Sequence, residues 1–151
     1  MLEYKIINKD EYDEIKELDE VRVKSYELSE QLDLFMNQIK DGKLIAIKVI
    51  LDNKTIGGSY VYISPNTNSL YIDRIFILQE YRNNNYASKL LNYILSNKEF
   101  FEDYYNREVT CSMVEPSSNE LIEFYKKNGY KGPNVLGNMT KELERTNRYT
   151  K

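Results

Sequence analysis

Residues 75–91 read IFILQEYRNNNYASKLL: an apolar segment, then an arginine, three asparagines and a helical pattern. The helical pattern continues to residue 94, with apolar residues at i, i+3, i+4 and i+7 from Ala87, which predicts an amphipathic helix. Asparagine is poor in strands and helices but is the best residue after glycine for left-handed backbone. The stretch therefore predicts a strand, a turn with positive φ and a helix. The N–H groups at the start of such a helix suit an anion.

The rest of the chain alternates between strand and helix patterns. β-branched and aromatic runs predict strands near residues 3–7, 43–51, 55–63, 70–78 and 108–114. Helical spacing predicts two helices within residues 10–40, where the apolar positions include Leu28, Leu32 and Phe35. A further helix is predicted after Ser117 or Ser118, either of which can cap it, and Gly129 is predicted to end it in left-handed backbone.

The remaining segments complete one predicted domain covering residues 1–151. Residues 99–106 read as a connecting stretch, residues 130–143 as one or two edge strands, and residues 144–151 as a frayed tail. The predicted fold class is α/β (α+β): a single mixed, mostly antiparallel central sheet flanked by helices.

Composition excludes several classes of function. The net charge of −3 argues against a general nucleic-acid binder, and no apolar run is long enough to span a bilayer. Histidine is absent, which removes triad chemistry and most zinc sites, so we expect no metal. The single cysteine allows no internal disulfide, and the first residues do not read as a signal peptide, so we expect a cytoplasmic protein.

Two segments resemble the GNAT superfamily of N-acetyltransferases. The segment 75–91 is similar to the acetyl-CoA-binding segment of that family, in which an apolar strand is followed by arginine or glutamine, two residues, glycine, one residue, and glycine or alanine. Asn85 stands here where the family prefers glycine. The segment SSNELIEFYKKNGY, residues 117–130, resembles the second helix of the family. The resemblance implies a GNAT-like acyl-CoA N-acyltransferase fold.

The resemblance also implies how acetyl-CoA, as co-substrate, would be held. Backbone groups of one strand would pair with the pantetheine amides, and the turn and first helical residues would bind the diphosphate. The hydroxyl of Ser88 can contact phosphate or cap the helix, and Asn119 lies near a coenzyme-facing asparagine of the family, shifted by one residue. The implied coenzyme-binding residues are Ile75, Phe76, Ile77, Arg82, Asn83, Asn84, Asn85, Tyr86, Ala87, Ser88 and Asn119.

Three residues are candidates for the chemistry. By resemblance, Tyr125 would protonate the leaving thiolate, although it can equally be a core aromatic. Asp73 interrupts the apolar run LYIDRIFIL, where a carboxylate needs a raised pKa or a specific partner. The resemblance places Asp73 near the acceptor amine as a base, directly or through water, although a structural ion pair would explain it as well. Glu115, just past the next strand, is the rival base.

The sequence therefore predicts an N-acetyltransferase that transfers the acetyl group of acetyl-CoA to a primary amine of a small molecule or peptide by direct attack. The alternative is a non-catalytic acyl-CoA-binding sensor or interaction domain on the same fold. The acidic residues Glu27, Glu30 and Asp33 hint at a basic acceptor but are equally typical of a solvated helix face. Homodimers are common in that family, so the resemblance also leads us to expect a homodimer.

Overall fold

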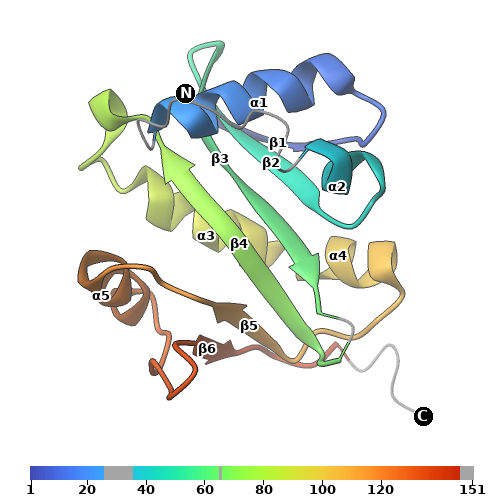
Figure 1. Ribbon diagram of the computed structural model, residues 1–151, viewed down its shortest axis with the longest axis vertical. Coiled ribbons are helices and arrows are strands. Elements are labelled where there is room, and N and C mark those ends of the chain that lie inside the picture. Colours follow the sequence, from blue (N-terminus) through green and yellow to red (C-terminus); the bar gives the residue numbers. More distant parts are fainter. Residues whose placement is uncertain (26–35, 65, 147–151) are drawn as a thin grey trace. The chain divides into compact units, whose positions relative to one another are not determined.

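The computed structural model describes residues 1–25, 36–64 and 66–146 (Figure 1). Within these ranges, a six-stranded sheet has the order β1-β2-β3-β4-β5-β6. Its strands are β1 (Leu2–Ile7), β2 (Ile45–Leu51), β3 (Lys54–Ile63), β4 (Ser69–Ile77), β5 (Cys111–Val114) and β6 (Met139–Glu142). The helices are α1 (Tyr12–Ser25), α2 (Met36–Lys40), the 3-10 helix η1 (Gln79–Tyr81), α3 (Tyr86–Ser96), α4 (Lys98–Tyr105) and α5 (Asn119–Lys127).

This architecture confirms the predicted mixed sheet flanked by helices. The pairs β1–β2, β2–β3 and β5–β6 are antiparallel, whereas β4 and β5 are parallel. The strand predicted at residues 70–78 is internal to the sheet, because β4 lies between β3 and β5. The predictions that concern Leu28, Leu32 and Phe35 lie outside the described residues, as do those that concern the acidic residues Glu27, Glu30 and Asp33.

The chain forms two compact units, each built from two separate segments. The first unit comprises Met1–Val61 and Arg74–Tyr93, and the second comprises Tyr62–Asp73 and Ile94–Lys151. Strand β4 therefore supplies its first residues to the second unit and its last residues to the first.

In the first unit, helices α1 and α3 cover opposite faces of β1. The ring of Tyr4 stacks on Tyr93 of α3, with ring centroids 4.4 Å apart. The next residue, Lys5, instead pairs with Glu14 of α1 and with Glu11, which directly precedes that helix. Successive strand residues point to opposite faces, so these two contacts fix one helix on each side.

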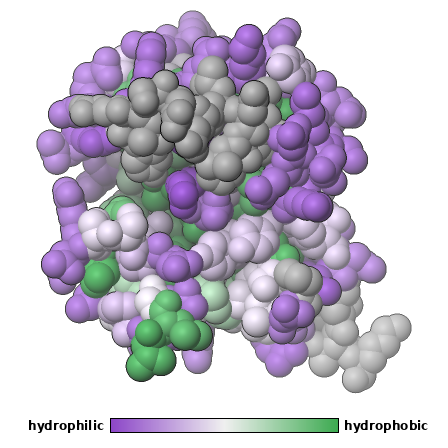
Figure 2. Space-filling view, viewed as in Figure 1, coloured by the Kyte–Doolittle hydropathy of each residue, from purple (hydrophilic) through white to green (hydrophobic). Residues whose placement is uncertain are grey.

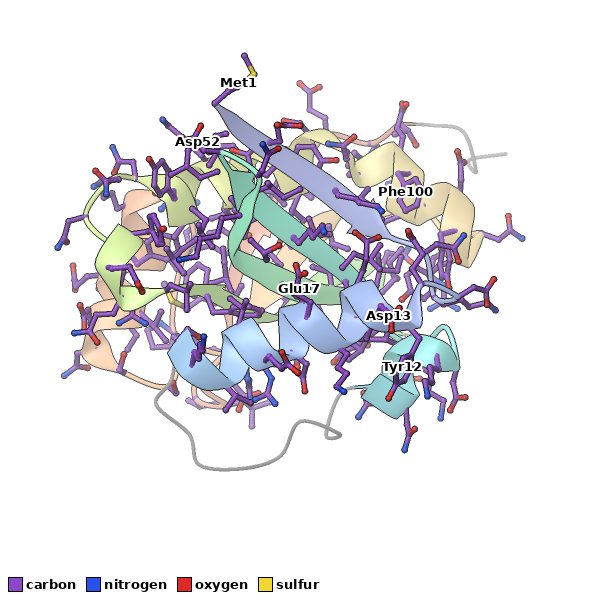
Figure 3. The ribbon with its side chains drawn as sticks, turned by 90° about the horizontal axis from the view of Figure 1, so that it is seen from above. Met1, Tyr12, Asp13, Glu17, Asp52 and Phe100 are labelled. Carbon is purple, nitrogen blue, oxygen red and sulfur yellow. The ribbon has the colours of Figure 1, made fainter. Side chains whose placement is uncertain are left out.

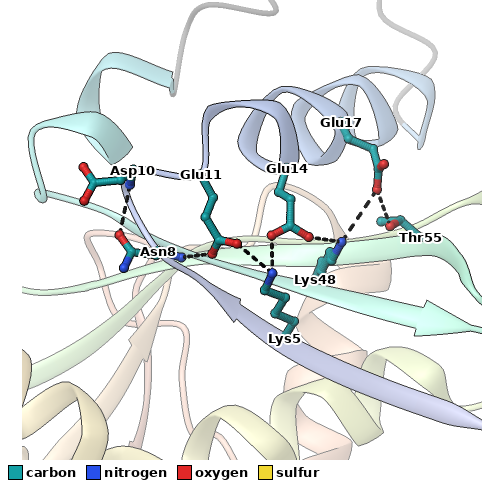
Figure 4. Close-up of polar contacts among 8 residues, drawn as sticks. All are labelled: Lys5, Asn8, Asp10, Glu11, Glu14, Glu17, Lys48 and Thr55. Carbon is teal, nitrogen blue, oxygen red and sulfur yellow. Dashed lines mark hydrogen bonds and ion pairs between the residues drawn. The ribbon is translucent and has the colours of Figure 1, made fainter.

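A polar network fastens α1 to the sheet (Figure 4). Lys5 and Lys48 are cross-strand partners, and both donate to the carboxylate of Glu14, Lys48 at 2.6 Å. These hydrogen bonds, with Lys48 the larger contributor, lower the pKa of Glu14 to about 2. One turn further along α1, Glu17 accepts a hydrogen bond of 2.5 Å from Thr55 of β3. Figure 3 shows Glu17 and Asp13 projecting from α1. The carboxylates on this side of α1 thus hold the helix in place.

A tight turn joins β2 and β3, the two antiparallel strands predicted near residues 43–51 and 55–63. Asp52 and Asn53 both adopt positive φ, 49° and 68°, which gives the backbone twist that a two-residue hairpin turn needs. Asp52 also accepts a hydrogen bond from the amino group of Met1 at 2.8 Å, and Figure 3 shows both residues at the same end of the strands.

In the second unit, residues 98–105 form helix α4, so the prediction of a connecting stretch at 99–106 was wrong. Phe101 and Glu102 are buried, and Phe100 and Tyr104, one turn apart, have their rings stacked at 6.4 Å. Asn106 ends the helix in left-handed backbone with φ 53°. The aromatic residues obscured the 3.6-residue period, because they occupy both the buried and the exposed face.

The C-terminal half of the second unit follows the prediction closely. Ser118 is the cap of α5 and accepts a hydrogen bond of 3.2 Å from the N–H of Leu121. Gly129 follows the helix with φ 93°, as predicted. Strand β6 pairs with β5, and an isolated bridge joins Lys131 to Thr140, which confirms one or two short edge strands.

A loop between α5 and β6 carries apolar residues into solvent. The side chain of Asn134 accepts hydrogen bonds from the N–H groups of Leu136 and Asn138, at 2.9 and 3.0 Å, and thereby shapes the loop. Val135 and Leu136 at its tip are exposed. Figure 2 shows a hydrophobic group at the lower edge of the molecule, where this loop lies in Figure 1.

Candidate active site

The asparagine turn has the backbone that the sequence predicts. After η1, Arg82 is extended, and Asn83 and Asn85 adopt positive φ, 68° and 62°. The side chain of Asn84 donates to the carbonyl oxygens of Tyr81 and Arg82, at 3.1 and 3.2 Å, which fixes the turn from within. Asparagine therefore takes the left-handed positions in which glycine is usual.

Helix α3 begins directly after this turn. The carbonyl of Asn85 accepts the hydrogen bond of the Lys89 N–H at 3.0 Å, so the first turn starts at this residue. The first N–H groups of a helix have no partner within the helix and carry the positive end of its dipole. Residues 82–85 are exposed and Tyr86, Ala87 and Ser88 are half-buried, so the region that the sequence predicts for phosphate is open to solvent on one side.

The side chain of Arg82 is used within the first unit. Its Nε donates to the carbonyl oxygen of Ile77 at 2.9 Å, and its Nη2 donates to that of Ser25 at 2.6 Å. Arg82 therefore joins the end of β4 to the end of α1 at the start of the turn. An anion would therefore contact Arg82 through its main chain or through the guanidinium N–H groups that these two hydrogen bonds do not use.

A buried network of charged residues lies next to this junction of β4 and α1, and the sequence analysis did not predict it. Asp19, Arg22 and Tyr60 are buried, and both Arg22 Nε and the Tyr60 hydroxyl donate to Asp19 Oδ1 at 2.7 Å. Burial, and then Asp19, raise the pKa of Tyr60 far above its usual value. Ser25 donates to the Arg22 carbonyl at 2.7 Å. Only the i, i+3 spacing of Asp19 and Arg22 hinted at this pair, and such pairs are common on exposed helix faces.

The strand residues that the sequence analysis expects to bind coenzyme lie in the last part of β4. Phe76 and Ile77 are buried and Ile75 is half-buried. The neighbouring strand β3 approaches closely here, since a side chain at Gly57 would lie 2.3 Å from the carbonyl oxygen of Phe76. Gly57 therefore permits the close packing of β3 against the segment predicted to pair with pantetheine.

The second unit brings together both candidate bases and two tyrosines that the sequence analysis missed. Asp73 is half-buried on β4, on the same strand face as Tyr71. The Tyr71 hydroxyl donates to Glu115 Oε2 at 3.0 Å, and its ring lies 5.0 Å from the ring of Tyr62 on β3. The signal was the alternation in LYID, which places Tyr71 and Asp73 on one strand face, but the register that brings Tyr62 beside Tyr71 cannot be read from the sequence.

Tyr125 lies in an aromatic cluster of the same unit. Its side chain is 5% exposed, and its ring makes edge-to-face contacts with Phe124 at 5.0 Å and Tyr130 at 5.2 Å. The Tyr130 hydroxyl lies 2.7 Å from Ser112 Oγ, and burial raises the pKa of Tyr130 to about 12. Asn119 is the first residue of α5 and is exposed. The core role and the catalytic role of Tyr125 both fit this position.

Neither a metal site nor a membrane span is found in the described part of the chain. Residues 1–25, 36–64 and 66–146 contain no cluster of three or more potential metal-ligating side chains. Among the helices in the same ranges, none has the length and apolar character needed to cross a membrane.

Comparison with known proteins agrees with the fold. The family described as the acetyltransferase (GNAT) domain matches residues 43–132, which include the asparagine turn and helix α5. The chain belongs to the GNAT acetyltransferase family. No curated protein shows a significant match to this GNAT domain over its sequence.

Solved structures of GNAT enzymes share the fold of this GNAT domain at low sequence identity. The PaiA N-acetyltransferase of Thermoplasma acidophilum, in complex with coenzyme A, has a TM-score of 0.64 at 16% identity, over 95% of this chain and 99% of that one. Aminoglycoside 6′-acetyltransferase type Ii has a TM-score of 0.72 at 15% identity, over 95% and 99%. The ribosomal-protein-S18-alanine N-acetyltransferase of Escherichia coli has a TM-score of 0.72 at 11% identity, over 99% of both chains.

Proposed function

We propose that this GNAT domain is an acetyl-CoA-dependent N-acetyltransferase that acetylates a primary amine by direct attack. The observation that carries the proposal is the turn at residues 82–85, which lies inside the family match and has left-handed asparagines at Asn83 and Asn85. A turn of this shape before a helix presents several backbone N–H groups to one anion. The diphosphate of acetyl-CoA is the anion that the family implies, and the coenzyme A bound to the Thermoplasma enzyme supports this.

Residues of the second unit carry out the two proton transfers of the proposed reaction. The acceptor ammonium loses a proton to Asp73, directly or through water, and the free amine attacks the thioester carbonyl. A C–N bond forms, the C–S bond breaks, and the thiolate takes a proton from Tyr125. The second proton that the nitrogen loses as it becomes an amide restores the Tyr125 hydroxyl. The overall reaction converts an ammonium and acetyl-CoA into an amide, free coenzyme A and one proton. With no histidine in the chain, a carboxylate and a phenol are the groups suited to these two proton transfers.

Calorimetric titration with acetyl-CoA tests the coenzyme site. Asn85→Gly keeps the left-handed backbone and is expected to retain binding, whereas Asn85→Val is expected to weaken it at least tenfold, because β-branched residues strongly disfavour positive φ. Asn92→Val, the same change at an exposed position of α3, is the control and is expected to bind normally. Equal binding by both Asn85 variants would contradict a phosphate role for this turn.

A turnover assay separates the enzyme from a non-catalytic acyl-CoA-binding domain. Release of coenzyme A thiol is measured over a panel of primary amines, with Tyr125→Phe beside the parent protein. The variant keeps the ring contacts with Phe124 and Tyr130, so we expect a lower kcat and little change in acetyl-CoA affinity. Tight coenzyme binding without turnover on any amine would favour the non-catalytic alternative, and an unchanged kcat would remove Tyr125 from the mechanism.

A further inference from the structure

Tyr62 and Tyr71 form an aromatic surface on the second unit. Their ring centroids are 5.0 Å apart with an interplanar angle of 33°, and both side chains are half-exposed. Other aromatic residues of the same unit, Phe101, Tyr125 and Tyr130, are instead buried in its core. The tyrosine pair thus keeps part of its ring surface available at the sheet face.

A carboxylate borders this aromatic surface. The Tyr71 hydroxyl donates to one oxygen of Glu115, at 3.0 Å, and Glu115 itself is exposed just past the carboxyl end of β5. A carboxylate offers about four acceptor positions, and the phenol occupies one of them. In parallel strands such as β4 and β5, the carboxyl ends are where ligands bind.

The electrostatic environment of the pair favours a cation. Burial, then Asp73 and Glu115, raise the pKa of Tyr62. Burial, and then the hydrogen bond to Glu115, raise the pKa of Tyr71 well above its usual value. A tyrosine is neutral near pH 7 even at its ordinary pKa of about 10, so a ligand here would meet ring faces and the negative charge of the carboxylates. An alkylammonium group suits this combination, because its charge is attracted to ring faces and to carboxylates.

We propose that Tyr62, Tyr71 and Glu115 bind a second positive charge of the acceptor, so that the preferred substrate is an aliphatic diamine. One amine is acetylated, the alkyl chain lies along the two rings, and the distal ammonium pairs with Glu115. This inference rests on the proposed acetyltransferase function and assigns Glu115 to substrate binding, with the proton transfer left to Asp73 or water.

The test compares two acceptors of equal length, 1,5-diaminopentane and 5-amino-1-pentanol, which differ only at the distal group. We expect kcat/KM to be about tenfold higher for the diamine, the combined size of one exposed cation–π contact and one exposed ion pair. Glu115→Gln and Tyr62→Leu are each expected to shrink this ratio through the KM of the diamine. Glu120→Gln, which removes an exposed carboxylate at the start of α5, is expected to leave the ratio as it is.

Direct binding distinguishes failure of this inference from failure of the proposed function. Both compounds are titrated into the protein and followed by NMR, with and without coenzyme A, so turnover is not required. Tighter binding of the diamine that Glu115→Gln abolishes supports the cation site even if no acetylation occurs. Equal binding and equal kcat/KM for the two compounds, or a preference that survives Glu115→Gln, would overturn the inference. Circular dichroism melts of each variant exclude unfolding as the cause.

Discussion

Arg82 allows a test of whether the proposed phosphate site at residues 82–85 depends on the charge of the guanidinium or on the hydrogen bonds that anchor the turn. Its guanidinium donates to two carbonyl oxygens that belong to different elements, Ile77 at the end of β4 and Ser25 at the end of α1. Arg82→Gln removes the forked donor and the charge, and Arg82→Lys keeps the charge but not the fork. If the two hydrogen bonds of the guanidinium anchor the turn, both variants should weaken this anchoring.

The expected magnitude follows from these two hydrogen bonds. Both hydrogen bonds have favourable lengths but are partly exposed to solvent. Each should therefore contribute about 1 kcal/mol to the free energy of unfolding, or about 2 kcal/mol together. For a chain of this size, that loss lowers the midpoint of thermal unfolding by about 4–8 °C. If all of the loss appeared in coenzyme binding instead, the dissociation constant for acetyl-CoA would rise about 30-fold.

The assays are thermal unfolding by circular dichroism and calorimetric titration with acetyl-CoA. Lys89→Gln removes the same charge from an exposed position on α3 and is the control for electrostatics. We expect Arg82→Gln and Arg82→Lys to be impaired alike and Lys89→Gln to behave as the parent. The anchoring argument is refuted if Arg82→Lys matches the parent in both assays while the two glutamine variants lose the same affinity.

Three further changes have defined consequences for stability. Ser118→Ala removes the acceptor for the Leu121 N–H and should cost about 1 kcal/mol, seen as a lower urea midpoint. The pKa of Glu14, held near 2 in the folded protein, lies below its unfolded value, so the unfolded chain binds more protons between about pH 2 and 4.5. Stability should therefore fall as pH drops through that window, and Glu14→Gln should flatten the fall in acid titrations followed by circular dichroism. Gly57→Ala would place a methyl group 2.3 Å from the Phe76 carbonyl oxygen and should cost about 3 kcal/mol or more in thermal melts.

Each of these changes has a matched comparison. Ser117→Ala alters the serine beside the cap and should be nearly neutral; equal losses at both serines would contradict the assignment of the cap. Glu20→Gln removes an exposed carboxylate from the same helix as Glu14. If it flattened the loss of stability in acid as much as Glu14→Gln does, the lysine contacts of Glu14 would not be the cause of that loss. A Gly57→Ala variant as stable as the parent would mean that β3 and β4 can separate without cost.

Much of the fold could be predicted because local chemistry and packing agree. The asparagines at residues 83 and 85 take positive φ, Ser118 caps its helix and Gly129 ends it, each as the residue type requires. These positions are decided by backbone sterics and by hydrogen bonds within a few residues. Such effects are visible in a short window of sequence.

Predictions failed or fell short where partners are distant in the chain. Helix α4 was missed because its aromatic residues cover both faces, so the burial of Phe101 is decided by packing. The contact of Tyr71 with Glu115 spans 44 residues, and that of Tyr60 with Asp19 spans 41. Nothing in the local pattern links such pairs, since their distances are set by strand order and register.

The interleaved segments of the two units also have a consequence for biosynthesis. A ribosome delivers the chain from the N-terminus, and the first 61 residues lack the part of the first unit that runs from Arg74 to Tyr93. The first unit can close only after Tyr93 has emerged. By then the opening segment of the second unit, Tyr62–Asp73, is already outside, whereas the rest of that unit, Ile94–Lys151, has still to follow. We expect nascent chains arrested when Tyr93 has just emerged from the ribosome to expose this segment, including the tyrosine pair, to chaperones.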